Sequence, residues 1–276
     1  MAVLTSLADV LPNTRLDMPA GTPVLDVADV RLSFAGIQAL MNVSFDVRPH
    51  ELFAVIGPNG AGKTSLLNCL SGVYRPDAGR LRFLGSDIVD VAPAHIARRG
   101  MARMFQNVEL FENLTVLDNL LLGRYVHVAY GAIAALVYVG RAKREELRHR
   151  RVVEELIDFL EIEQYRKLPV GLLPYGISKR VELGRALAME PKLLLLDEPV
   201  AGMNLEETED MARFILDIRE ELAIAMILVD HDMGVVMDLA DRILALDFGR
   251  PIALGTPGEI QSDENVIRAY LGDEGS

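Results

Sequence analysis

The fold of this chain is decided by the segment Gly57-Pro58-Asn59-Gly60-Ala61-Gly62-Lys63-Thr64. This segment matches the pattern G-x-x-x-x-G-K-[ST] and lies between LFAVI, which is typical of a strand, and SLLNCL, which is typical of an apolar helix. Backbone N–H groups of such a glycine-rich turn and the positive end of the following helix together form a cradle for phosphate. The sequence therefore predicts a nucleotide-binding phosphate loop at 57–64.

The side chains at the end of the phosphate loop have separate tasks. Lys63 supplies a mobile positive charge for the β- and γ-phosphates, and Thr64 offers a hydroxyl to Mg²⁺. Ser65, the next residue, is a candidate contact for the α-phosphate. The alternative is a glycine-rich turn followed by an incidental Lys-Thr pair, and the flanking strand and helix patterns argue against it.

A second motif places two carboxylates after a run of leucines, in the segment Leu193-Leu194-Leu195-Leu196-Asp197-Glu198. The leucines predict a buried strand, and ligands of parallel sheets bind at the carboxyl edge. We therefore expect Asp197 to hold Mg²⁺, directly or through water, and Glu198 to take a proton from the attacking water. An isolated Asp-Glu pair often only caps a turn, but the phosphate loop argues against that interpretation here.

Strand and helix patterns alternate on either side of a helical middle. Stretches rich in β-formers and bounded by Gly, Pro or Asp predict strands at 24–34, 43–47, 52–56 and 81–84. Apolar spacing predicts a helix that begins near Arg141. Strand and helix patterns return over 193–246, so we expect a largely parallel central sheet and an α/β fold.

Composition excludes several classes of protein. The 276 residues include 28 Lys plus Arg against 40 Asp plus Glu, a formal net charge of −12, which argues against nucleic acid as a partner. One cysteine, Cys69, excludes an internal disulfide and a multi-cysteine metal site. The longest uncharged run, 126–140, is shorter than the ~18 residues that suggest a membrane-spanning helix. Residues 1–23 do not read as a signal peptide, and we expect them to form a flexible tail.

Further residues follow one another in a fixed order: Phe34, then Gln106 after a strand at 103–105, then Ala201-Gly202-Met203-Asn204, then His231. In this order they resemble the ATP-binding subunit of an ABC transporter, most closely the importers of branched-chain amino acids. The resemblance implies that Phe34 stacks on adenine and that 201–204 crosses between two protomers. It also implies that Gln106 reaches the metal and the attacking water, and that His231 contacts the γ-phosphate.

The signature segment departs from the family pattern L-S-G-G-Q. It reads Leu173-Pro174-Tyr175-Gly176-Ile177, so Pro174 replaces the serine and Ile177 the glutamine. Proline has neither a hydroxyl nor an N–H to offer the γ-phosphate held by a partner protomer. The amides of Tyr175 and Gly176 remain available at a helix N-terminus, and Ser178 is a replacement donor. We therefore expect a functional signature that binds through backbone amides.

A basic segment follows the apolar run 126–140, in which His127 is the exception. Residues 141–151 carry six bases against two acids on an otherwise acidic chain. One interpretation is a surface helix preceded by a packing segment. The other is a contact with a membrane partner and anionic lipid headgroups. Composition does not choose between them.

The resemblance implies an α/β P-loop NTPase core (ABC ATPase) with an antiparallel β subdomain and an inserted α-helical subdomain at about 107–189. The ABC ATPase domain then covers 24–256 and a C-terminal helical extension covers 257–276.

The same resemblance implies an ATPase that uses ATP and Mg²⁺ and closes head to tail, as a homodimer or as a heterodimer with a related ATPase subunit. Its partners would be transmembrane permease subunits and, indirectly, a periplasmic substrate-binding protein. It would be peripheral, on the cytoplasmic face of the inner membrane. The alternatives are an ATP-binding regulator with little hydrolysis, owing to the altered signature, and an ABC ATPase acting on DNA or ribosomes. The latter needs coiled coils or a basic linker, and neither is encoded here.

Overall fold

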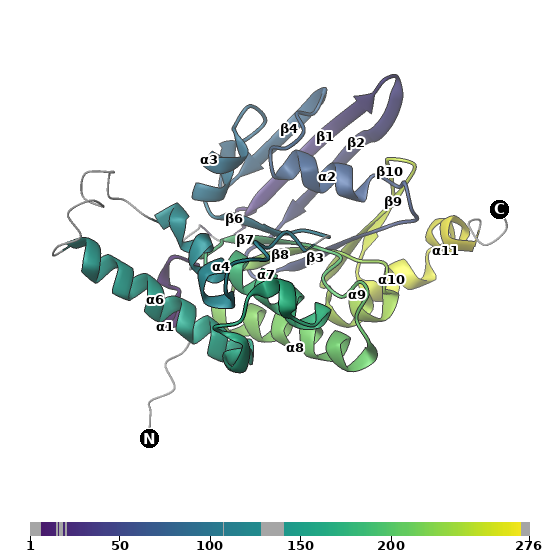
Figure 1. The fold of residues 1–276 in the computed structure, drawn as a ribbon. Coiled ribbons are helices and arrows are strands. Elements are labelled where there is room, and N and C mark those ends of the chain that lie inside the picture. Colours follow the sequence, from purple (N-terminus) through teal and green to yellow (C-terminus); the bar gives the residue numbers. More distant parts are fainter. Residues whose placement is uncertain are drawn as a thin grey trace.

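A six-stranded sheet forms the centre of the fold, with strand order β10-β9-β3-β8-β7-β6 (Figure 1). The computed structural model describes residues 7–14, 16, 19, 21–106, 108–127 and 141–271. Strands β6, β7, β8, β3 and β9 pair in parallel, and β10 is antiparallel to β9. The bounds are β3 Leu52–Ile56, β6 Met101–Met104, β7 Leu193–Asp197, β8 Ala225–Val229, β9 Arg242–Asp247 and β10 Arg250–Gly255. The prediction of a largely parallel sheet and an α/β fold is confirmed.

Three of the four inner strands, β3, β8 and β7, are buried along their whole length. Their sequences are nearly continuous apolar runs, as expected where both faces of a parallel sheet are covered. Burial at both ends of each run explains why the sequence predicted β3 and β7 to within one residue.

A second, antiparallel sheet has the strand order β2-β1-β4-β5 and lies above α2 in Figure 1. Its strands are β1 Leu25–Phe34, β2 Ile37–Val47, β4 Ala78–Phe83 and β5 Ser86–Asp87, and helix α2 spans Lys63–Leu70. One hydrophobic cluster joins this sheet, α2 and one face of the central sheet. Phe45 of β2 stacks on Phe53 of β3, with ring centroids 4.9 Å apart. The antiparallel sheet therefore packs against α2 and helps to fix its position.

Helices cover the other face of the central sheet, where a second hydrophobic cluster lies. They include α4 Val116–Gly123, η2 Arg124–His127, α6 Arg141–Phe159, η4 Val170–Leu172, α7 Tyr175–Leu187, α8 Leu205–Leu222 and α9 Met233–Leu239. Helix α3 (Pro93–Arg98) instead buries Ile96 in the cluster on the side of the antiparallel sheet. Helix α6 begins at Arg141, where the apolar spacing predicted a helix start. None of the helices in the described part of the chain combines the length and the hydrophobicity that a membrane-spanning helix needs. Of the apolar run 126–140, residues 128–140 lie outside the described part.

The prediction of a flexible tail is wrong for residues 7–14. They form helix α1 (Leu7–Val10), which contacts α8 and α6, and the 3₁₀ turn η1 (Pro12–Thr14). Leu7 and Leu11 are buried in the core. The Leu7 amide donates to Glu221 Oε2 at 3.2 Å. Two leucines one turn apart are too few for periodicity to reveal, because the face they cover is made by distant helices.

The chain ends in two short helices, α10 (Pro257–Ser262) and α11 (Glu264–Leu271). The side chains of Thr256 and Glu259 form a capping box at the start of α10. Both helices pack against β10, and α10 also packs against β9. Residues 272–276 of the expected helical extension lie outside the described part.

Candidate nucleotide-binding site

The phosphate loop joins the end of β3 to the start of α2. Gly57, Gly60 and Gly62 all have positive φ angles, of 149°, 81° and 101°. A Cβ atom on Gly57 would lie 2.2 Å from the carbonyl oxygen of Leu246, and one on Gly62 would lie 2.6 Å from that of Ala39. The loop therefore needs glycine for its conformation and also because neighbouring backbone lies against it.

Lys63 folds back across the loop. Its Nζ donates to the carbonyl oxygens of Gly57 at 2.5 Å and Pro58 at 3.0 Å, and the residue is 9% exposed. Burial lowers the pKa of Lys63, while the charges of Glu198 and Asp197 oppose that shift. The ammonium group is therefore held close to both carboxylates, with carbonyl partners that a phosphate can replace. Thr64 is exposed and Ser65 is half-buried at the first turn of α2.

Asp197 lies at the carboxyl end of β7 and pairs with an arginine that sequence reasoning missed. Arg103 of β6 donates from Nη2 to Asp197 Oδ2 at 2.7 Å, and its Nη1 donates to Asn68 Oδ1 at 2.7 Å. The side chains of Arg103 and Asp197 are 7% and 2% exposed. The other oxygen, Asp197 Oδ1, is buried and has no hydrogen-bond partner among the described residues. A buried, unpaired carboxylate oxygen is a donor that suits a divalent cation.

The structure brings three other predicted residues together next to Asp197. Gln106 Nε2 donates to Glu198 Oε2 at 2.9 Å, and His231 Nδ1 lies 3.8 Å from the same oxygen. Glu198 has a φ of 50°, in the left-handed region. Its amide donates to the carbonyl oxygen of Val229 at 2.7 Å, which holds this unusual backbone in place.

His231 is positioned by Asp230, which follows β8. Asp230 Oδ1 accepts from the amides of His231 at 2.7 Å and Asp232 at 2.9 Å. Burial raises the pKa of Asp230, and these amides oppose the shift. Asp232 then caps α9 by accepting from the amide of Val235. The sequence signal for Asp230 was its place at a strand end, the same signal that identified Asp197.

The signature segment opens helix α7. Pro174 is its N-cap residue, with a φ of −56° and no side-chain capping bond. Ser178, expected as a replacement donor, is buried and donates to the carbonyl oxygen of Pro174 at 3.3 Å. It therefore faces its own helix. Tyr175 is half exposed, and its ring lies against Gly202 in the loop 201–204.

Gly176 is confined from the side of α8. A Cβ atom at this position would lie 2.4 Å from Glu207 Oε1. Glu207 in turn forms a capping box with Asn204. The signature glycine and the start of α8 are therefore closely packed, so a larger residue at 176 would displace the Glu207 side chain from its place beside the signature.

A buried ion pair links α7 to the residues that follow β6. Lys179 Nζ donates to the carbonyl oxygens of Phe105 at 3.1 Å and Gln106 at 2.8 Å. Glu182 Oε1 accepts from the amide of Phe105 at 3.1 Å. Lys179 Nζ lies 3.5 Å from Glu182 Oε2, and these two side chains are 0% and 1% exposed. Burial raises the pKa of Glu182, and Lys179 opposes the shift. The backbone of Gln106 is thereby tied to the signature helix, a link that no local pattern predicted.

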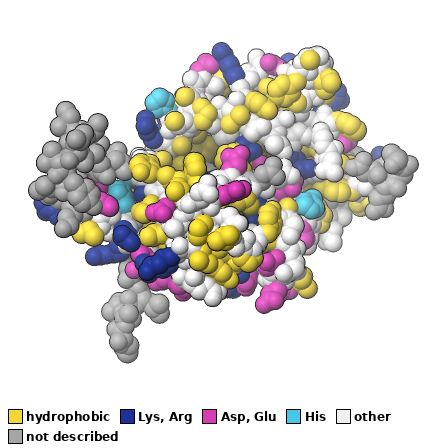
Figure 2. All heavy atoms as spheres, in the orientation of Figure 1, with side chains coloured by type: hydrophobic (Ala, Val, Ile, Leu, Met, Phe, Trp, Pro, Cys, Tyr) yellow, Lys and Arg dark blue, Asp and Glu magenta, His cyan; other side chains and the backbone are white. Residues whose placement is uncertain are grey.

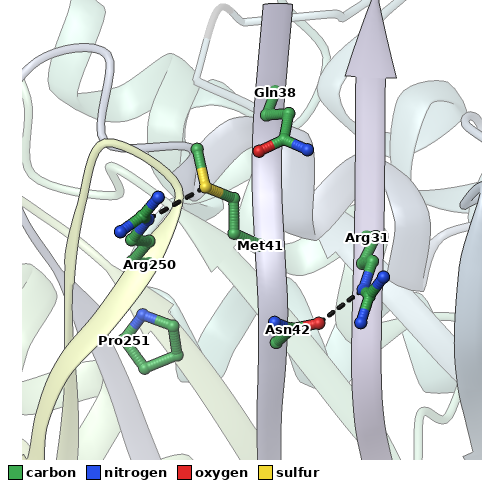
Figure 3. Close-up of a pocket in the computed structure, with 6 residues that line it drawn as sticks. All are labelled: Arg31, Gln38, Met41, Asn42, Arg250 and Pro251. Atoms are coloured by element: carbon green, nitrogen blue, oxygen red, sulfur yellow. Dashed lines mark hydrogen bonds between the residues drawn. The ribbon is translucent and has the colours of Figure 1, made fainter.

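Phe34 ends β1 and is 44% exposed, with its ring at an edge-to-face angle of 70° to Tyr74. Elsewhere, between β2 and β10, a shallow pocket of about 620 Å³ lies on the surface (Figure 3). Its arginines are engaged, because Arg31 donates to Asn42 and Arg250 donates to the sulfur of Met41. None of its lining residues belongs to the phosphate loop.

Family models match two parts of the chain. Residues 40–201 match the model described as ABC transporter. Residues 250–276 match the model described as branched-chain amino acid ATP-binding cassette transporter.

Individual proteins resemble the chain over most of its length. The branched-chain amino acid transport ATP-binding protein BraF of Pseudomonas aeruginosa is 36% identical, over 91% of this chain and 98% of the relative. LivG of Escherichia coli, of the same description, is 37% identical over the same shares. A solved ATP-binding cassette of an ABC transporter in its ADP conformation is 29% identical with a TM-score of 0.79, covering 91% of this chain and 99% of that one.

Proposed function

The chain belongs to the ABC transporter family of ATP-binding subunits, and on that premise we propose that it powers an importer of branched-chain or related amino acids. The cargo class is supported by the similarity of its C-terminal segment and by the transport for which BraF and LivG are named. The observation that carries the catalytic part is the meeting of Gln106, Glu198 and His231 at the end of β7 and β8.

Hydrolysis at this site depends mostly on positioning and charge stabilisation. The amides of 57–64, together with Lys63 and Ser65, neutralise and hold the phosphates, and Phe34 stacks on adenine. Glu198 takes the proton of the attacking water at a carboxylate oxygen, while His231 orients that water. To reach the phosphates, Lys63 exchanges its carbonyl partners at Gly57 and Pro58 for phosphate oxygens.

Magnesium suits the residues beside the phosphate loop. Asp197 Oδ1 is buried and has no hydrogen-bond partner in the part of the chain that the structure describes, and Thr64 is exposed at the start of α2, so both offer the hard oxygen donors that Mg²⁺ prefers. We assign Asp197, Thr64 and Gln106 to hold the ion, directly or through water. When bound, the ion neutralises charge on the β- and γ-phosphate oxygens.

Two protomers close head to tail in this proposal, with ATP between the phosphate loop of one and the signature helix of the other. The amides of Tyr175 and Gly176 at the start of α7 meet the γ-phosphate of the partner's ATP. The partner is a second copy or a related ATPase subunit. Since ATP binds across the closed interface, its binding shifts the pair towards closure.

This chain has a groove on which transmembrane permease subunits can dock. A cavity of about 360 Å³ lies between α3, α4 and α7, and Figure 2 shows hydrophobic side chains gathered over a hollow between α3 and α4. Ile96, Leu122 and Phe105 are among its lining residues, and Phe105 directly precedes Gln106. An apolar permease segment in this groove would place the chain peripherally on the cytoplasmic face of the inner membrane and would link transport to the site.

Steady-state phosphate release by the purified chain tests this function. We expect Glu198→Gln to lower kcat by about 10²- to 10⁴-fold while ATP still binds, because a general base is lost and the binding groups remain. We expect Lys63→Ala to weaken ATP binding itself. Glu206→Gln, an exposed acid in the first turn of α8, is the matched control. A wild-type chain that binds ATP with no more turnover than Glu198→Gln would instead be a regulator.

A further inference from the structure

Helix α7 holds the main chain around Gln106 with charged side chains. Lys179 Nζ donates to the carbonyl oxygens of Phe105 and Gln106, at 3.1 Å and 2.8 Å. Glu182 accepts from the amide of Phe105 at 3.1 Å. Both charged side chains are buried, and their spacing of three residues puts them on one side of the helix. The chain that follows β6 is therefore bound to α7 through its backbone atoms.

A third side chain of α7 extends this grip beyond Gln106. Arg185, on the same side of the helix, donates from Nη1 to the carbonyl oxygen of Glu109 at 2.5 Å. We call three residues the backbone clamp: Lys179, Glu182 and Arg185. Their hydrogen bonds to this segment go to main-chain atoms, which leaves the side chain of Gln106 free to donate to Glu198.

The helix that carries the backbone clamp also carries the signature segment. Lys179 Nζ lies over the ring of Tyr175, 6.0 Å from its centroid, and the edge of that ring lies against Gly202. The ammonium group that binds the backbone of Gln106 therefore also lies over the signature tyrosine.

We propose that the backbone clamp is a set of positioning residues for hydrolysis: it fixes the main chain of 105–109 so that Gln106 Nε2 donates to Glu198 Oε2. This inference rests on the proposed ATPase function and adds to it residues that act through Gln106. The 2.9 Å bond to Glu198 is made by a long, flexible side chain, so it depends on where the backbone of Gln106 is held. Placement matters because a displacement of about 1 Å can cost about 10²-fold in rate.

A clamp that only stabilises the fold makes a different prediction. Its loss would lower the free energy of unfolding, and any fall in kcat would be by the same factor whatever residue stands at position 106. A positioning role acts through Gln106, so loss of the clamp has no further effect once that side chain has been removed. A double-mutant cycle with Gln106→Ala separates the two roles.

The experiment measures kcat, the KM for ATP and Tm of the purified full-length chain. The principal variant combines Lys179→Met with Glu182→Gln, which removes both buried charges together and leaves neither unpaired. We expect kcat to fall by about 10- to 100-fold, with KM changed by less than about twofold because the phosphate-binding residues 57–64 are unaltered. In the Gln106→Ala background, the same two changes should leave kcat within about twofold.

Arg185→Met is a second, milder variant, because it removes one hydrogen bond from a partly exposed side chain and keeps the buried pair. It should lower kcat by about two- to tenfold, again only where Gln106 is present. The matched control is Arg180→Met with Asp210→Asn, since this ion pair lies on the same helix but joins it to α8. The control should keep the kcat of the wild type within about twofold.

An unchanged kcat in the clamp variants, or an equal fall with and without Gln106→Ala, would overturn the positioning role. An equal fall in the control would do the same. If the Lys179 and Glu182 variant does not fold, Arg185→Met alone decides between these outcomes. Failure of the proposed function is distinct, because the wild-type chain would then not hydrolyse ATP, or Gln106→Ala would itself leave kcat unchanged.

Discussion

Pro174 illustrates how a single residue acts on both local structure and assembly. It occupies the N-cap position of α7, where serine would accept a hydrogen bond from the helix backbone, and no capping side chain is present. The neighbouring Ser178 cannot compensate from its buried position against Pro174. The N-terminal amides of α7 therefore have less side-chain assistance than the family pattern provides.

We expect Pro174→Ser to stabilise the chain by about 1 kcal/mol through the restored cap, and to add a hydroxyl donor for the partner's γ-phosphate. Sedimentation with ATP, in a Glu198→Gln background that prevents turnover, should show a larger dimer fraction. Pro169→Ser, at the N-cap of η4, is the control because it changes the same residue type away from the signature. An equal dimer fraction with and without Pro174→Ser would contradict the prediction.

At the scale of elements, buried charges join segments that are far apart in the sequence. Arg124 of η2 pairs with Glu190 at 2.8 Å, where both side chains are at most 3% exposed, and its Nε donates to His149 Nδ1 of α6 at 3.1 Å. The amide of Asn13 donates to Glu190 Oε2 at 2.9 Å. Helix α6, the loop before β7 and the N-terminal segment therefore meet at one polar cluster. An unpaired charge here would be costly, so its members stabilise the fold as a set.

This cluster predicts a loss of stability in acid. His149 must be neutral to accept the hydrogen bond from Arg124. Burial lowers the pKa of His149 most, and the charge of Arg124 lowers it further. His127 and Arg148 add to this shift, and Glu145 opposes it. In the unfolded chain His149 takes up a proton near pH 6.5, and in the folded chain it does so only at lower pH. Protonation therefore favours unfolding, and stability falls as the pH drops below about 6.5.

His149→Gln tests this dependence, because glutamine keeps an acceptor for Arg124 and does not titrate. Between pH 7.5 and 5.5 we expect the Tm of His149→Gln to fall less than that of the wild type, by differential scanning fluorimetry. His95→Gln, at an exposed position on α3, should follow the wild type. Parallel Tm curves for all three proteins would refute the role of His149.

At the scale of the whole molecule, the N-terminal segment 7–14 packs into the hydrophobic core. Leu11 is fully buried in the cluster formed by α6, α8 and the central sheet. Leu11→Ala should lower the free energy of unfolding by about 2–5 kcal/mol, because a cavity remains where the side chain packed. Urea denaturation measures this change. Asp9→Ala, at an exposed position of α1 two residues before Leu11, should be nearly neutral, and equal losses for the two variants would show that the segment is not packed in solution.

Sequence by itself determined the phosphate loop, the fully buried strands of the central sheet and the apolar face of α8. Each of these is a local signal. The positive-φ glycines lie in one loop, the runs at β3, β7 and β8 are buried along their length, and Met211, Phe214, Ile215, Ile218 and Leu222 recur at helical spacing and are all buried. The order of the motifs along the chain also named Gln106, Glu198 and His231 as candidates.

Only the tertiary structure decided which groups meet. It paired Arg103 with Asp197, tied the backbone of Gln106 to α7 through Lys179 and Glu182, and packed Leu11 into the core. The physical reason is that periodicity reports whether a side chain is buried along its own element, whereas a hydrogen bond or an ion pair depends on the neighbour that the folded chain brings to it from far away.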